Sequence, residues 1–125
     1  MRQIKFRGQI KDTKEWVYGY LIIKTEIIRI EGTNGITGDV YYIINDENTF
    51  KVIPETVGQF VDTFKGFEGD VYCENCSFYI LTYNSRLGGF LMVDTKTKKF
   101  AEESSFNKVG NIYDATEEQK KEWGL

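Results

Sequence analysis

The sequence predicts a mainly β fold, and three observations lead to that prediction. Nine Phe, eight Tyr and two Trp stand among 125 residues, and with many β-branched residues they suit a pleated, half-buried sheet surface. Short apolar stretches recur with Gly, Asn and Asp between them, a pattern typical of strands and turns. A helical pattern occurs only at the C-terminal end. We therefore expect a small barrel or sandwich-like sheet, followed by a short helix.

The N-terminal residues predict a hairpin. Gln3–Ile10 alternates loosely, which indicates a strand with one solvent-exposed face. The polar Lys11–Lys14 segment predicts the turn, and Trp16–Ile23 predicts the returning strand. The exposed face of the first strand is expected to carry Lys5, Arg7 and Gln9.

The returning strand has two apolar faces. Trp16, Tyr18 and Tyr20 share one face, and Val17, Gly19 and Leu21 share the other. We expect one face to join the core. The other face should be covered by a neighbouring segment or by a second subunit.

The next segment predicts further strands and one long loop. Ile27–Ile30 should continue the sheet after a break near Lys24-Thr25, and Gly32–Asp39, with three glycines, should be a loop. Val40–Ile44 and Phe50–Ile53 predict a second hairpin. Its pairing should stop at Pro54, which lacks an N–H group and suits the first position of a short helical turn.

The second half predicts short strands and then the helix. The expected strands are Val71–Cys73, Phe78–Tyr83, Phe90–Val93 and Val109–Tyr113, with a short return at Phe100-Ala101. Thr116 and Gln119 match a capping box, so a helix should start there, and Trp123 should dock it. We expect one domain with sub-lobes at residues 1–61 and 68–113, and a terminal helix within 114–125.

Composition excludes several classes of function. Apolar residues make up 41% and charged residues 28%, as in soluble globular proteins, and the net charge of −3 is too small to define a partner. No apolar run or leader predicts a membrane, so a cytoplasmic protein is expected. The chain has no histidine, which excludes Ser-His-Asp and Cys-His catalysis and any His-ligated metal. We expect no catalytic residues and no cofactor.

The C-x-x-C pair of Cys73 and Cys76 has two interpretations. A structural zinc site needs four ligands, and one chain supplies only these two cysteines. Zinc shared between two subunits would satisfy that need, whereas the alternative is two small residues beside a tight turn. Strand-like flanks do not fit a thioredoxin-type site, which sits at a helix start. We expect no metal within a single chain.

Other candidate sites are weaker. The Gly32–Asp39 loop lacks the Lys-Ser/Thr ending of a phosphate-binding P-loop. Glu55 and Asp70 could in principle act as an acid–base pair, but a sequence does not give their separation. Asp70 is better explained by hydrogen bonds to backbone N–H groups at the Glu68-Gly69-Asp70 corner.

Three blocks of sequence stand out: IKFRG and EWVYGYLI at residues 4–8 and 15–22, PETVGQF and EGDV at 54–60 and 68–71, and VGNIYD at 109–114. They resemble, in that order, the start, the central motif and the closing motif of the YopX family of proteins encoded by phages and prophages of Gram-positive bacteria. The segment between Gln59 and Glu68 is shorter than the family pattern.

The resemblance implies a β-rich fold whose C-terminal half is an SH3-like barrel beginning at Gly69. It also implies a phage gene product in the host bacterial cytoplasm, and it supplies no activity or catalytic residue that could be carried over to this chain. The motif and interaction candidates are Trp16, Tyr18, Glu55, Thr56, Gln59, Glu68, Gly69 and Asp70.

We expect a non-enzymatic, self-associating interaction module, a homo-oligomer that engages a phage or host protein. The apolar strand faces that need cover support this expectation. The alternative is a nucleic-acid-binding accessory protein, since aromatic strands beside basic residues can stack bases. That alternative predicts salt-dependent binding that is lost when Lys5, Arg7 or Trp16 is changed.

Overall fold

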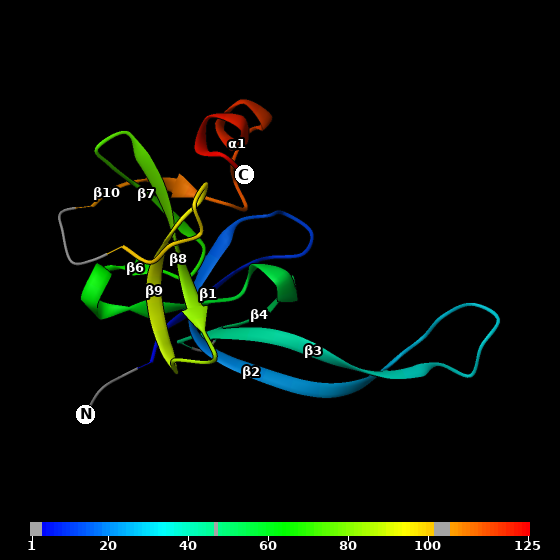
Figure 1. Cartoon of the computed structure of the whole chain (residues 1–125). Helices are drawn as coiled ribbons and strands as arrows, with labels where there is room; N and C mark the ends of the chain where they lie inside the picture. Colours follow the sequence, from blue (N-terminus) through cyan, green and yellow to red (C-terminus); the bar gives the residue numbers. More distant parts are fainter. Residues whose placement is uncertain (1–3, 47, 102–105) are drawn as a thin grey trace. The chain divides into compact units, whose positions relative to one another are not determined.

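A computed structural model describes residues 4–46, 48–101 and 106–125 (Figure 1). The chain divides into two compact units, Met1–Phe60 and Val61–Leu125. The described residues are mostly strand, arranged in antiparallel sheets, with one short α-helix at the C-terminal end. The predicted mainly β fold class is therefore confirmed. The SH3-like detail of the C-terminal half stays a prediction.

The first unit is built on a meandering antiparallel sheet. Its strands are β1 (Phe6–Gln9), β2 (Trp16–Ile28), β3 (Ile36–Asn45), β4 (Asn48–Val52) and β5 (Gly58–Val61), which pair in the order β4-β3-β2-β1-β5. The 3-10 turn η1 (Pro54–Thr56) starts at the proline, as predicted. A bridge between Ile10 and Val52 joins the ends of β1 and β4. The sheet thus curls until its first and fourth strands meet.

The core of the first unit lies where these strands converge. Val40, Ile43 and Val52 are buried. A Cβ atom on Gly8 would lie 3.0 Å from the Val52 Cβ, so glycine lets β1 approach β4 closely.

The predicted solvent-exposed face of the first strand is wrong for two of its three residues. Arg7 and Gln9 are buried, and only Lys5 is exposed. Gly8, which lies on the opposite face of β1, is buried as well, so both faces of this strand are covered. The Arg7 guanidinium lies over the Trp16 ring, with the Cζ atom 4.5 Å from the ring centroid. The predicted strand's first residue, Gln3, lies outside the described residues.

The predicted break near Lys24-Thr25 is also wrong. β2 runs unbroken to Ile28 and pairs with β3 from Tyr20↔Ile44 to Ile28↔Ile36. Residues 36–39 therefore belong to a strand and not to the predicted Gly32–Asp39 loop. Gly38 counted toward the predicted loop, but the strand needs a glycine here because a Cβ would lie 2.7 Å from the Ile28 Cδ1. This glycine makes room for a cross-strand isoleucine.

The second unit carries a four-stranded sheet and the helix. After the 3-10 turn η2 (Asp62–Phe64) and β6 (Gly66–Phe67) come β7 (Asp70–Glu74), β8 (Ser77–Asn84), β9 (Gly89–Asp94) and β10 (Asn107–Asn111). The sheet order is β10-β7-β8-β9. β10 begins and ends two residues earlier than predicted, and the predicted return at Phe100 is a single bridge to Val93.

The core of the second unit is a cluster beneath this sheet. Val61, Tyr72, Leu81 and Met92 are its buried members. Around it pack partly buried residues that are mostly aromatic: Phe64, Tyr79, Phe90, Ala101 and Phe106. The aromatic content that predicted strands therefore serves the core here.

The C-terminal helix α1 (Glu117–Trp123) confirms the prediction made from the tail. Thr116 and Gln119 form the capping box, each side chain accepting from the other's backbone N–H. Trp123 is only 4% exposed and its ring lies 6.4 Å from that of Phe78. The Thr95 hydroxyl donates to the Trp123 carbonyl, so side chain and backbone both anchor the helix.

Candidate interaction surface

The most unusual surface of the first unit is a two-stranded ribbon of residues 23–40, which we call the arm. β1 pairs with β2 only as far as Gly19, and β4 pairs with β3 only as far back as Tyr41. Beyond those pairs, the part of the chain that the structure describes pairs β2 and β3 only with each other (Figure 1). Residues on both faces of the arm are exposed, among them Ile27 and Ile28, whereas Val40 at its base is buried.

The arm is rich in exposed isoleucine. Ile27 is 69% exposed, the largest fraction among the exposed large hydrophobic residues described. The exposed isoleucines of the arm are Ile23, Ile27, Ile28, Ile30 and Ile36. Strand alternation puts Ile23 and Ile27 on one face and Ile28, opposite Ile36, on the other. Apolar surface gathered on one element in this way marks an interaction site more often than scattered residues do.

A small polar cluster lies at the base of the arm. The Tyr42 hydroxyl donates to the Glu26 carboxylate at 2.9 Å, and the Lys24 Nζ lies 5.4 Å from the centroid of the Tyr42 ring. The hydrogen bond to Glu26 raises the pKa of the Tyr42 phenol above its ordinary value, and burial and the negative charge of Glu26 act in the same direction. The cluster fixes opposite charges two residues apart on β2.

The predicted aromatic face of β2 is only partly covered. Tyr18 and Tyr20 are exposed, whereas Trp16 is half-buried beneath the Arg7 guanidinium. Arg7 is 3% exposed, so its charge is not presented to solvent. The expectation that one apolar face needs a neighbour fits Tyr18 and Tyr20.

The candidates of the PETVGQF block support the first unit's fold. The Thr56 Oγ1 accepts from the Gln9 backbone N–H at 2.9 Å and donates to the Ile53 carbonyl at 2.7 Å. Gln59 belongs to β5 and lies opposite Phe6. Glu55 is exposed on the 3-10 turn. Only Glu55 of this group is fully displayed to solvent.

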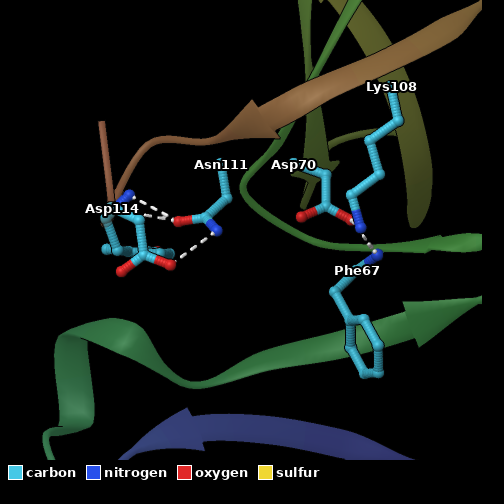
Figure 2. A network of polar contacts seen from close by, with 6 residues as sticks. Phe67, Asp70, Lys108, Asn111 and Asp114 are labelled. Carbon is cyan, nitrogen blue, oxygen red and sulfur yellow. Dashed lines mark hydrogen bonds and ion pairs between the residues drawn. The ribbon is translucent and has the colours of Figure 1, made fainter. Parts of the chain in front are cut away.

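The Glu68-Gly69-Asp70 corner organises the second unit (Figure 2). Asp70 is fully buried, and its Oδ2 accepts from the Phe67 N–H at 2.8 Å and lies 3.1 Å from the Lys108 Nζ. This confirms the prediction that Asp70 bonds backbone at the corner. Gly69 has a φ of +93°, donates its N–H to the Leu81 carbonyl, and accepts from Ile112. Glu68 is half-buried in the turn.

A second turn closes the same region. The Asn111 Oδ1 accepts from the Tyr113 and Asp114 backbone N–H groups, each at 2.9 Å, and its amide lies 3.2 Å from the Asp114 Oδ2 (Figure 2). This Asx-type arrangement ends β10 within the VGNIYD block. The Asn111 and Asp114 side chains therefore shape this turn.

Cys73 and Cys76 lie on the β7–β8 hairpin. Glu74 pairs with Ser77, so the turn is made by Asn75 and Cys76, both at positive φ. Both cysteines are free thiols, with Cys76 exposed and Cys73 half-buried. Among the described residues, no three His, Cys, Asp or Glu side chains gather into a group that could hold a metal ion.

Comparisons with protein-family models, curated proteins and solved structures return no match. None of the helices within residues 4–46, 48–101 and 106–125 has the length and apolar character needed to cross a membrane.

The sequence reasoning placed its candidates on β2 and at the two central turns, and it missed the arm. A signal was present in the run from Leu21 to Ile30, where isoleucine recurs on both faces of a strand. An apolar run with polar interruptions on both faces is what a ribbon without a third strand requires.

Proposed function

We propose that this chain is a YopX-like protein of phage or prophage origin. It would act in the host bacterial cytoplasm as a non-enzymatic, self-associating interaction module that engages a phage or host protein. The observation that carries the self-association is the arm, whose isoleucines are exposed on both faces of two strands.

The arm has the low intrinsic stability of a two-stranded ribbon. A two-stranded hairpin is marginally stable in water, and three or more strands, or packing against another element, are needed for independent stability. The arm extends past both of its neighbouring strands and still carries large apolar side chains. Burial of one such side chain contributes about 1.5–3 kcal/mol. Cover from a second copy would stabilise the arm and remove this apolar surface from water.

Motif residues that carry the resemblance have structural roles in this chain. Thr56, Gly69 and Asp70 each make contacts on which a turn depends. Residues that specify a fold are those expected to recur in a family without a shared reaction.

The nucleic-acid alternative loses one of its main groups. Arg7 is buried on Trp16, which leaves neither the cation nor that face of the indole open to a phosphate or a base. Lys5 is exposed and could still contact phosphate. A protein that uses single-stranded nucleic acid would instead present the aromatic face and the basic groups together.

Light scattering on the purified protein tests the proposal. We expect a discrete oligomer whose mass is unchanged by a short single-stranded oligonucleotide at low or high salt. A monomer that gains mass only with the oligonucleotide, and only at low salt, would replace the proposal with the nucleic-acid alternative.

A further inference from the structure

One edge of β2 is open along most of the strand. β1 covers this edge from Trp16 to Gly19, and from Tyr20 to Ile28 the described chain places no strand beside it. An uncovered strand edge presents N–H and C=O groups to any strand that can reach them. The open edge is therefore a place where another chain can pair.

The backbone hydrogen bonds around β1 show which residues of β2 point their N–H and C=O groups out of that edge. Lys5 and Gln9 accept from Phe60 and Ile53, on the β5 side of β1, while Ile10 donates to the Glu15 carbonyl at 2.9 Å. Backbone N–H and C=O groups point alternately to the two edges of a strand, so those of Glu15, Val17 and Gly19 point toward β1. The β2–β3 register continues without a shift to Ile28. Leu21, Ile23, Thr25 and Ile27 therefore direct N–H and C=O outward.

From this edge we infer that two copies of the chain pair β2 against β2, antiparallel, about a two-fold axis at Thr25. The inference rests on the proposed self-association and specifies its geometry. The two arms would form one continuous four-stranded sheet, β3-β2 of one copy beside β2-β3 of the other. Each open edge then gains a neighbouring strand.

The charges of β2 select this register. A two-fold axis at Lys24 would place the Lys24 side chains of the two copies directly opposite each other, and an axis at Glu26 would do the same for the two Glu26 side chains. Like charges directly opposite are destabilising. An axis at Thr25 instead sets Lys24 opposite Glu26 on both sides of the two-fold. An axis at Ile23 leaves both charges without an opposite charge.

The apolar residues fit the same register. With Thr25 on the axis, Ile23 faces Ile27 of the partner copy and Ile22 faces its Ile28. Ile23, Ile27 and Ile28 are exposed in the single chain. Cross-strand apolar and opposite-charge pairs each stabilise a sheet, and here every such pair occurs twice by symmetry. A pairing of the two β2 strands shifted by one residue would also fail. It would set residues whose backbone groups point toward the partner opposite residues whose groups point toward β3, and these cannot hydrogen-bond.

Charge reversal tests the register. Lys24→Glu and Glu26→Lys each set like charges opposite one another at both symmetric pairs, and should weaken self-association roughly tenfold or more. The double variant K24E/E26K restores opposite charges and should return to within about threefold of the native protein. Circular dichroism of each variant checks that the fold is kept.

Cysteine cross-linking provides a second measurement in a background with Cys73→Ser and Cys76→Ser. Across the two-fold, the Thr25 Cα atoms would be about 5.5 Å apart, inside the range of a disulfide. Thr25→Cys should therefore form a covalent dimer under copper-phenanthroline oxidation. Thr37→Cys, on β3, is the control, because its copies would lie about 20 Å apart and should stay unlinked.

The outcomes separate the two proposals. A native protein that is monomeric at all concentrations overturns both. A native oligomer that is unaffected by either single reversal, with no Thr25→Cys dimer, overturns the edge pairing and leaves self-association standing. Reversal that weakens, double reversal that restores, and a cross-link at Thr25 alone support the pairing.

Discussion

Replacing Gly69 by alanine tests whether the Glu68-Gly69-Asp70 corner specifies the fold. Gly69 adopts a φ of +93°, and a Cβ atom there would lie 2.8 Å from the Tyr113 Cε2. Two penalties therefore apply to Gly69→Ala. A left-handed backbone costs a residue with a Cβ about 1–2 kcal/mol, and forcing an extra methyl into a packed site costs about 1–3 kcal/mol. The free energy of unfolding should fall by roughly 2–5 kcal/mol.

A matched control separates the two penalties. Gly88 has a φ of +69° and no heavy atom within 4 Å of the position of its Cβ, so Gly88→Ala carries only the backbone cost. We expect Gly69→Ala to be less stable than Gly88→Ala by about 1–3 kcal/mol. The double variant Gly69→Ala/Tyr113→Ala removes the ring, so the penalty of Gly69→Ala, measured against Tyr113→Ala alone, should shrink to that of Gly88→Ala.

Urea unfolding followed by tryptophan fluorescence measures these differences. Equal stabilities of Gly69→Ala and Gly88→Ala would refute the packing argument at Tyr113. An unfolding free energy of Gly69→Ala equal to that of the native protein would refute the whole account of the corner.

Three further predictions concern single contacts. The Glu26 hydrogen bond raises the pKa of Tyr42, so Glu26→Gln should lower that pKa. The stability that this contact adds is present below the ordinary phenol pKa of about 10 and is lost as pH rises through the pKa of Tyr42 in the folded state. Absorbance titration, with Tyr42→Phe as the reference, can check this. Thr56→Val removes the hydroxyl that binds two backbone groups, so the free energy of unfolding in urea should fall by about 1–3 kcal/mol. Thr56→Ser keeps the hydroxyl and should cost less than about 1.5 kcal/mol. Equal losses for the two variants would contradict the role of the hydroxyl. Thr95→Val removes the bond to the Trp123 carbonyl and should lower stability by about 1 kcal/mol in the same assay, and no loss would contradict that anchor.

Local features could be predicted from the sequence because their causes are local. The capping box depends on Thr116 and Gln119, three residues apart, and its geometry follows from the helix start itself. Pro54 begins a short helical turn because its φ is fixed and it has no N–H group. Asp70 bonds the backbone of Phe67, again three residues away.

Features that depend on distant residues could not be predicted. Gln9 is buried and bonds Thr56, 47 residues later in the chain, so the polarity of β1 alone does not show which of its faces is covered. The arm was missed because a neighbouring strand ends, whereas at Gln9 a distant segment adds cover. Residues of β2 beyond Gly19 lose their third strand, and with two half-exposed faces the alternation of apolar and polar side chains disappears.

The residues of the candidate surface also divide into those predicted from local sequence and those whose exposure depends on distant residues. Tyr18 was identified because aromatic residues at a period of two mark a strand face. Ile23 and Ile27 were not, since their exposure depends on where β1 and β4 end. Strand length and pairing therefore decide this surface more than residue type does.

Sedimentation velocity of three proteins tests the central claim, self-association through the arm, most directly. The variant Ile23→Thr/Ile27→Thr keeps β-branched side chains and exchanges apolar surface for hydroxyls. Val109→Thr makes the same kind of change at an exposed strand residue of the second unit. At about 0.8 kcal/mol per methyl-sized group, the four changed sites of a dimer should weaken association by about 3 kcal/mol, more than a hundredfold. We predict an oligomer for the native chain and Val109→Thr, and a monomer for the arm variant at the same concentration. A native monomer, or equal oligomers in all three, would contradict the account.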